Sequence, residues 1–295
     1  MDNNAYKARY DSYVKLTEDR LLTLCDRYLP VTAEISRAAR YSLLSGGKRV
    51  RAVLVLSACE LAGGDVNAAA DYAAALEMLH CYSLIHDDLP CMDNDDFRRG
   101  QPSCHRKYGE STALLAADAL VTAAFEVIAN APLSAESRVR AASILSKGAG
   151  ARGMLYGQEL DKYFEQHRAD ADRLLNLHRH KTGALILAGV QLGCAACNTA
   201  PECSDALETY AQEIGLVFQI VDDILDVTSS TETLGKPVGS DAENDKTTFV
   251  TLYGLDGAHS MAEQHNNAAL VVLEPLGEKA DFLRCLARSL LVRNK

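Results

Sequence analysis

The sequence that decides the fold is DVNAAADYAAALEMLHCYSLIHDDLP, residues 65–90. Residues 65–86 are rich in Ala, Leu and Met and contain neither Gly nor Pro, so we expect one long helix. Pro90 disfavours a helical conformation at the residue before it. The helix should therefore end close to Asp87 and Asp88.

The rest of the chain also has helical periodicity. Around residues 206–225 the apolar side chains recur every three or four positions, the stripe of an amphipathic helix. Runs of alternating apolar and polar residues between turn signals are missing, so strands should be scarce. Gly and Pro separate the helical segments, and no linker or repeat marks a domain boundary. We expect residues 1–295 to form a single all-α domain, a helical bundle around a central cavity.

The composition limits the classes of function. Hydrophobic residues make up 48% of the chain, enough for a large core, and the net charge of −10 argues against a nucleic-acid partner. The nine Cys fit no disulfide framework and favour a reducing cytoplasm. The N-terminus lacks the apolar core of a signal peptide, and the most apolar stretch, residues 184–197, is too short to span a membrane. We expect a soluble cytoplasmic protein without stable membrane insertion.

Asp222, Asp223 and Asp226 form one group of carboxylates. Asp222 and Asp226 are four residues apart and so share one helix face. The residues before them, among them Phe218 and Val221, are strongly apolar, which argues against an ordinary solvated acidic face. Carboxylates in such surroundings need a cation, and oxygen ligands with no nearby His or Cys suit Mg²⁺.

Asp87, Asp88 and Asp93 form the other group of carboxylates. The first two should lie at a helix C-terminus, where the macrodipole disfavours anions, so a metal explains them better. Mg²⁺ usually takes only one or two carboxylates and completes its shell with water and phosphate oxygens. Aspartates on two different helices therefore suggest a diphosphate held between them through metal ions.

Short basic groups accompany these acids. Three cations follow the Gly46-Gly47 turn, an Arg pair follows the first aspartates, and further Lys residues lie in the C-terminal half. Because they stand beside glycines in an acidic protein, diphosphate binding is favoured over a solvated surface. The residues concerned are Lys48, Arg49, Arg51, Arg98, Arg99, Lys181, Lys236 and Lys246.

The motifs that contain these residues resemble those of the trans-isoprenyl diphosphate synthase family, in particular its bacterial type of farnesyl diphosphate synthase. Residues 83–100 resemble the first aspartate-rich motif of the family, with a spacer of four residues rather than two before the last Asp. Residues 218–226 resemble the second aspartate-rich motif. The stretches 46–51, 180–183 and 233–236 have counterparts too, in the same order along nearly the whole chain.

The resemblance implies a prenyltransferase that depends on Mg²⁺, with Mn²⁺ as an alternative metal, and that forms a homodimer. Its substrates would be isopentenyl diphosphate and an allylic diphosphate, dimethylallyl or geranyl, and its product farnesyl diphosphate. The allylic diphosphate ionises, the isopentenyl double bond attacks the resulting cation, and a proton is lost.

The resemblance also implies roles for individual residues. The isopentenyl diphosphate would be bound by Lys48, Arg51, His80 and Arg99. The allylic diphosphate would be bound by Arg98, Lys181, Thr182, Gln219, Lys236 and Lys246. The metal would be bound by Asp87, Asp93 and Asp222, supported by Asp88 and Asp226. The expected catalytic set is Asp87, Asp88, Asp93, Arg98, Lys181, Asp222, Asp223 and Asp226.

Product length is expected to depend on Tyr82 and Ser83, five and four residues before Asp87 on the same helix. Tyr82 lies about 7.5 Å from Asp87 along the axis and flanks the face of that carboxylate. The resemblance implies that a bulky aromatic here forms a floor that stops the product at C15. Ordinary helix packing is the alternative interpretation of Tyr82.

Some positions depart from the family pattern. Ala52 stands where Pro is common, and Gln101, Ala117 and Tyr156 also differ. Asp245 and Val250 flank the Lys246 motif where Gly and Pro are usual. None of these changes removes a metal or diphosphate ligand, but the last two affect the surroundings of Lys246.

Other classes of function stay open at this point. A geranylgeranyl diphosphate synthase would differ in product length. A terpene cyclase shares the aspartates, but it binds no isopentenyl diphosphate, so the basic motifs argue against it. A metal-dependent phosphohydrolase would use His86 and Asp87 but leaves the second aspartate group unexplained. Glu77-x-x-His80 is an element of di-iron sites, yet the sequence contains no second copy. A non-catalytic subunit would not need complete aspartate groups.

Overall fold

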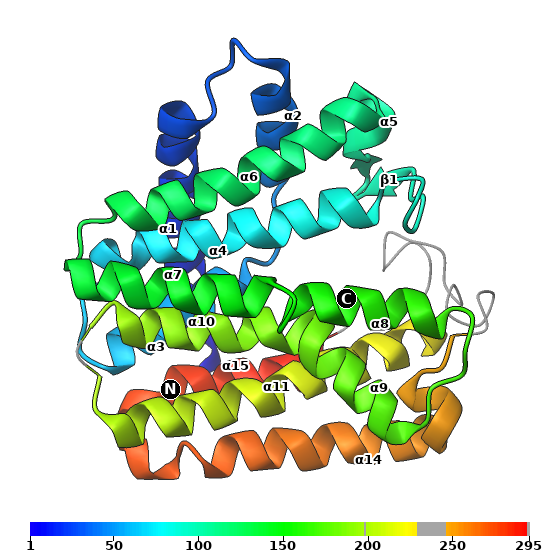
Figure 1. The fold of residues 1–295 in the computed structure, drawn as a ribbon. Helices are drawn as coiled ribbons and strands as arrows, with labels where there is room; N and C mark the ends of the chain where they lie inside the picture. Colours follow the sequence, from blue (N-terminus) through cyan, green and yellow to red (C-terminus); the bar gives the residue numbers. More distant parts are fainter. Residues whose placement is uncertain (198, 229–245, 294–295) are drawn as a thin grey trace. The chain divides into compact units, whose positions relative to one another are not determined.

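The computed structural model describes residues 1–197, 199–228 and 246–293 (Figure 1). Helices account for nearly all of its regular structure, which confirms the all-α prediction. The helices of the first half are α1 (Asn3–Tyr28), α2 (Glu34–Leu43), α3 (Val50–Leu61), α4 (Val66–Asp87), α5 (Cys104–Tyr108), α6 (Glu110–Asn130) and α7 (Ala135–Ala149). Those of the second half are α8 (Met154–Phe164), α9 (Ala171–His178), the π-helix η1 (Arg179–Gly183), α10 (Ala184–Ala195), α11 (Pro201–Thr228), α14 (Phe249–Val271), the 3₁₀ helix η2 (Glu274–Ala280) and α15 (Asp281–Leu291).

The described strands form one small hairpin. β1 (Phe97–Arg98) pairs antiparallel with β2 (Gln101–Pro102). The turn between them has a left-handed backbone at Arg99 and Gly100, with φ of 53° and 75°. The hairpin directly follows the first aspartate group, so it turns the Arg pair back toward the end of α4.

Helices α4 and α11 form as predicted. Asp65 caps α4 by accepting the N–H of Asn67 at 2.9 Å, and the helix ends at Asp87. Pro90 therefore stops the helix where the sequence indicated. The segment 206–225 lies inside the 28-residue helix α11.

The chain divides into two compact units. Unit 1 contains residues 1–6, 146–190 and 199–295, and unit 2 contains residues 7–145 and 191–198. The expectation of one domain over residues 1–295 stays a prediction.

In unit 2, α4 packs against both α3 and α6, and Figure 1 shows α6 running beside α4. Most residues of α4 itself are buried, on nearly all sides of the helix. Its side chains are therefore mostly small or apolar. α6 is long and apolar enough to cross a membrane by length and composition alone, but 44% of its most apolar window is buried in the protein. A core helix of a soluble protein has the same properties, so the feature is weak evidence for a membrane span.

In unit 1, α11 packs along α14, as Figure 1 shows, and also contacts η1 and α15. The backbones of α11 and η1 lie close together at Gly215 and Gly183. A Cβ on Gly215 would lie 3.2 Å from the Cα of Gly183. At the start of α14, Thr248 and Thr251 form a capping box. Unit 1 thus fixes η1 and the beginning of α14 against α11.

Candidate active site

A basic loop in unit 2 leads into α3. Gly46 and Gly47 have φ values of 82° and 128°, which side chains rarely adopt, and Arg49 has a φ of 52°. Helix α3 starts directly afterwards, at Val50. The loop therefore presents Lys48 just before the helix and Arg51 in its first turn.

His80 on α4 lies against this loop. Its Nε2 is 3.3 Å from Nη1 of Arg51. The pKa of His80 is held well below its usual value, first by burial and then by the positive charges of Arg51, Arg99, Arg49 and Arg98. The imidazole is therefore neutral at physiological pH and can accept a hydrogen bond from Arg51.

Arg99 reaches the same loop from the hairpin. Its Nη1 donates closely to the carbonyl of Gly46 and lies 3.4 Å from Oγ of Ser45. A Cβ on Gly47 would come within 2.9 Å of the guanidinium, so only a glycine leaves this space open. Burial, and then the charge of Arg49, lowers the pKa of Arg99. Three of the four residues implied for isopentenyl diphosphate are thus linked in one cluster, and the fourth, Lys48, lies in the same loop.

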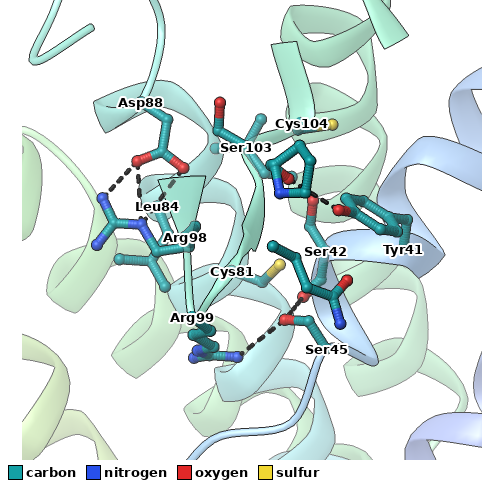
Figure 2. Close-up of a pocket in the computed structure, with 13 residues that line it drawn as sticks. Tyr41, Ser42, Ser45, Cys81, Leu84, Asp88, Arg98, Arg99, Ser103 and Cys104 are labelled. Carbon is teal, nitrogen blue, oxygen red and sulfur yellow. Dashed lines mark hydrogen bonds and ion pairs between the residues drawn. The ribbon is translucent and has the colours of Figure 1, made fainter. Parts of the chain in front are cut away.

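Arg98 points elsewhere, toward the first aspartate group (Figure 2). Its Nε donates to Oδ1 of Asp88 at 3.0 Å, and its Nη2 lies 3.4 Å from Asp95. Asp88 is 2% exposed, and burial raises the pKa of its carboxyl although Arg98 opposes that shift. Asp88 therefore orients Arg98 in this structure, a contact that the sequence did not indicate.

A pocket of about 350 Å³, which includes its open mouth, lies behind the hairpin. Figure 2 shows α2, α4 and the hairpin around it, with Arg98 and Arg99 pointing apart. It is lined by Tyr41, Ser42, Ser45, Cys81, Leu84, Ile85, Asp88, Arg98, Arg99, Gln101, Pro102, Ser103 and Cys104.

Asp87 is the last residue of α4 and is 9% exposed. The loop that follows folds back on the helix end, because the N–H of Asp93 donates to the carbonyl of Asp87 at 2.8 Å. Asn94 adopts a left-handed backbone with φ of 55° and donates to the carbonyl of Leu89 at 3.1 Å. The four-residue spacer thus forms a turn that returns Asp93 to the end of the helix that carries Asp87.

Tyr82 and Ser83 lie on the buried part of α4. Tyr82 is 5% exposed, and its ring packs edge-on against His86 with centroids 5.6 Å apart. Burial, and then the charge of Asp87, raises the pKa of Tyr82 to about 12. Ser83 donates to the carbonyl of His80 at 2.8 Å. The structure thus has Tyr82 packed close to the Asp87 end of the helix.

In unit 1, the π-helix η1 carries Lys181 and Thr182. Short π-helical turns are rare and often occur at functional sites. α8 approaches this turn so closely that a Cβ on Gly157 would lie 2.1 Å from the backbone nitrogen of Lys181. Lys181 forms a close ion pair with Asp161 of α8, and Thr182 donates to Oε1 of Gln219 at 2.6 Å. Three of the residues implied for the allylic diphosphate are therefore positioned together by α8, η1 and α11.

The three aspartates of the second group, near the end of α11, have different surroundings. Asp222 accepts from Arg293 at 2.7 Å, and its side chain is 42% exposed. Asp223 accepts the N–H of Phe249 at 2.8 Å, so it holds the first turn of α14. Asp226 is 2% exposed. A role of Asp223 at the start of a helix was not expected from the sequence.

Two further acids in unit 1 surround the lysines. Burial opposes the ionisation of Asp161, but Lys181 and Lys246 lower the pKa of its carboxyl below the usual value. Glu165 lies 2.7 Å from Lys162 and 4.0 Å from Lys246. Asp161 lies on α8, and Glu165 is the residue that directly follows this helix. The spacing of four residues between the two acids is the signal by which they could have been found. Lys236 and Asp245 lie outside the described residues.

The described residues include no group of three His, Cys, Asp or Glu side chains arranged to hold a metal ion by themselves. Mg²⁺ does not need such a group, since it takes one or two carboxylates and fills its shell with water and phosphate oxygens. Asp87 with Asp93, and Asp222 with Asp226, supply hard oxygen donors in pairs and no thiol or imidazole. The residues therefore fit Mg²⁺.

Comparisons with known proteins find similar sequences and folds. The sequence profile of the polyprenyl synthetase family matches residues 32–279. The chain is 41% identical over 273 residues to the farnesyl diphosphate synthase of Micrococcus luteus, covering 92% of this chain and 94% of that protein. It is 46% identical over 268 residues to the chloroplastic geranylgeranyl pyrophosphate synthase of Catharanthus roseus, covering 88% and 74%. Its fold matches a geranyltransferase of Helicobacter pylori, solved with magnesium and isoprenyl diphosphate, with a TM-score of 0.81, 35% identity and 96% coverage of each chain.

Proposed function

The chain belongs to the polyprenyl synthetase family, and from this premise we propose that it condenses isopentenyl diphosphate with dimethylallyl or geranyl diphosphate to give farnesyl diphosphate. It is a prenyltransferase by its family. The product is proposed from its bacterial relative and from Tyr82, a bulky side chain buried five residues before Asp87.

The observation that carries the proposal is the cluster of cations around His80. Burial, and then the positive charges of Arg51, Arg99, Arg49 and Arg98, hold the pKa of this imidazole well below its usual value. Arg49 and Arg98 are paired with Glu77 and Asp88, and a bound diphosphate would reduce the repulsion that the positive charges of Arg51 and Arg99 add to the cluster. A diphosphate supplies several oxygens that the guanidinium groups can bind in bidentate fashion.

In the proposed reaction, Lys48, Arg51, His80 and Arg99 bind the isopentenyl diphosphate and orient its double bond. Arg98, Lys181, Thr182, Gln219, Lys236 and Lys246 bind the allylic diphosphate and stabilise the charge that develops as it leaves. Asp87, Asp93 and Asp222 would hold the metal, supported by Asp88 and Asp226, while Asp223 would support the catalytic set through α14. Mg²⁺, when bound, neutralises the departing diphosphate, and Mn²⁺ would replace it. Apolar side chains such as Tyr82 exclude water that would otherwise quench the allylic cation.

A geranylgeranyl product is the second candidate, since a geranylgeranyl pyrophosphate synthase is also among the relatives. A terpene cyclase or a phosphohydrolase leaves the cluster of cations around His80 without a role. The deciding experiment incubates the purified protein with Mg²⁺, isopentenyl diphosphate and each allylic diphosphate in turn, and sizes the products. Farnesyl diphosphate as the main product supports the proposal. A C20 product favours the second candidate, and a cyclised product or free phosphate contradicts both.

We further propose that the protein is a cytoplasmic homodimer and that residues 1–295 act as one domain. No disulfide joins any of the nine cysteines, all of which lie in the part of the chain that the structure describes, as a reducing compartment favours. Leu114 and Leu115, at the start of the apolar helix α6, are 45% and 51% exposed, and a second copy would cover them. Sedimentation equilibrium of the full chain, with Leu114→Asp as the comparison, tests the dimer.

A further inference from the structure

The start of α3 has an unusual backbone. Arg49, the residue before the helix, lies in the left-handed region with φ of 52° and ψ of 30°. For a residue with a Cβ this conformation costs about 1–2 kcal/mol. Arg49 is 5% exposed, and its neighbours Lys48 and Arg51 are the diphosphate-binding candidates. Something in the surrounding structure must therefore hold Arg49 in place.

Glu77 on α4 supplies that support. Its Oε2 lies 3.4 Å from Nη1 of Arg49, and both side chains are 2% exposed. The other end of the guanidinium donates to the carbonyl of Leu43 at 2.9 Å. Glu18 of α1 lies farther from this guanidinium, at 3.8 Å from Nε, and its side chain is 46% exposed. Loss of Glu77 should therefore be costly, because the buried charge of Arg49 would keep only a more distant and more exposed partner.

Glu77 also binds the backbone of α3. Its Oε1 accepts the N–H of Ala52 at 3.1 Å. Arg49 makes no side-chain hydrogen bond as the N-cap residue, so the carboxylate of α4 satisfies an N–H that a cap would otherwise take. A negative charge at this end of a helix is also favoured by the macrodipole.

His80 follows Glu77 by one helical turn and contacts Arg51 at 3.3 Å. One face of α4 thus touches the basic motif at three places: the guanidinium of Arg49, the first turn of α3, and the side chain of Arg51. Glu77 itself is too deeply buried, at 2% exposed, to reach a bound diphosphate.

We propose that Glu77 is a positioning residue for the isopentenyl diphosphate site, which fixes Lys48 and Arg51 by holding Arg49 and the first turn of α3. This inference rests on the proposed function. It gives the Glu of the Glu77-x-x-His80 motif a role that needs no second metal motif.

The test replaces Glu77 by Gln in the full chain. The amide keeps the size of the side chain and one oxygen for Ala52, but it removes the buried charge opposite Arg49 and leaves the more exposed Glu18. We expect KM for isopentenyl diphosphate to rise about tenfold, while KM for geranyl diphosphate stays within about twofold. Arg49→Lys keeps the charge but loses the guanidinium fork, and it should change the same constant in the same direction.

Asp71→Asn is the matched control. Asp71 is on the same helix, is 3% exposed, and pairs with Arg20 of α1, but it does not contact the basic motif. It should lower the thermal midpoint like Glu77→Gln and leave the ratio of the two KM values unchanged. An unchanged ratio in Glu77→Gln and Arg49→Lys, or an equal change in Asp71→Asn, would overturn the inference.

Wild-type turnover separates this inference from the proposed function. If the wild type fails to condense the two diphosphates, the proposed function is wrong, whatever the variants do. In that case calorimetric titration with isopentenyl diphosphate still compares wild type with Glu77→Gln. Equal affinity of the two proteins would then contradict the positioning role.

Discussion

At the scale of single residues, a short hairpin with a two-residue turn gives the adjacent arginines Arg98 and Arg99 different partners. Arg98 lies against Asp88, and Arg99 lies against Gly46 and Ser45 (Figure 2). The left-handed φ of 53° at Arg99 turns its side chain away from that of its neighbour. Sequence adjacency therefore does not imply a shared ligand.

Arg98→Ala and Arg99→Ala should therefore affect different substrates. We expect Arg98→Ala to raise KM for the allylic diphosphate and Arg99→Ala to raise KM for isopentenyl diphosphate, each about tenfold or more, because a charged hydrogen bond is lost. Steady-state kinetics with each substrate varied in turn measures both constants. Equal increases in both constants for both variants would refute the distinction.

The aspartates of the two groups are also testable one at a time. Asp87→Asn or Asp222→Asn should lower kcat on the order of a hundredfold, because an amide is a poor ligand for a hard cation. Circular dichroism should show an unchanged helical fold, since neither carboxylate is a capping group. Near-normal turnover of either variant at ordinary Mg²⁺ concentration would show that the metal assignment is wrong.

Tyr82 is expected to limit product length. Tyr82→Ala removes the ring that packs against His86 near the end of α4, so the growing chain can pass and the product should shift from C15 toward C20. Total condensation should persist, because the metal and diphosphate groups are unchanged. Tyr82→Phe, which keeps the ring, is the control and should still give C15. Products no longer than those of wild type, from a folded and active Tyr82→Ala protein, would place the limit elsewhere.

At the scale of elements, functional side chains are presented by helix ends and irregular turns. Lys181 and Thr182 lie on a π-helical turn, Asp87 ends α4, and Arg51 lies in the first turn of α3. Each of these elements is held by a neighbour: α8 holds the π-helix, and α4 holds α3. The packing of one element therefore sets the position of ligands on another.

Gly157→Ala tests this at the π-helix. The new Cβ would meet the backbone of Lys181 at 2.1 Å, so α8 and η1 would have to separate, at a cost of about 3 kcal/mol or more. We expect a lower thermal midpoint and a higher KM for the allylic diphosphate. Gly183→Ala is the control in the same turn, because its Cβ would meet nothing nearer than 3.4 Å. A Gly157→Ala protein with wild-type stability would contradict the close packing.

At the scale of the whole molecule, an acidic protein gathers its cations locally. The net charge is −10, yet each unit has its own basic cluster: arginines around His80 in unit 2, and lysines beside Asp161 in unit 1. Buried titratable groups accompany both clusters. Stability should therefore depend on pH well above the range in which surface carboxylates titrate.

For His178, the direction in which stability changes with pH can be predicted. Burial lowers its pKa to about 4, against the usual 6.5, with Asp161 and Lys181 beside it and Phe249 stacked on its ring. Between these values the unfolded chain binds one more proton than the folded one, so stability falls as the pH falls from about 6.5 to 4, by about 3 kcal/mol. Urea unfolding from pH 7 to 4.5 measures the loss. His178→Gln should reduce it, whereas replacement of the exposed His259 should not. Equal acid sensitivity of wild type and His178→Gln would refute the assignment.

The sequence by itself determined the elements and the chemistry. The composition of residues 65–86 and the position of Pro90 predicted α4 and its end at Asp87, and the stripe at 206–225 predicted α11. These signals are local, because helix periodicity and proline sterics act within a few residues. The spacing of acids and bases also indicated a diphosphate enzyme, which the family comparison agrees with.

Only the tertiary structure decided which partner each polar group takes. It pairs Asp88 with Arg98, puts Asp223 at the first turn of α14, and gives Glu77 to Arg49 and to an N–H of Ala52 that Pro would lack. These partners are 10 to 28 residues apart along the chain. Such pairs depend on how helices pack, and buried polar groups accept whichever donor the packing brings near. The sequence thus determined which groups are available, and the packing of the helices determined which of them meet.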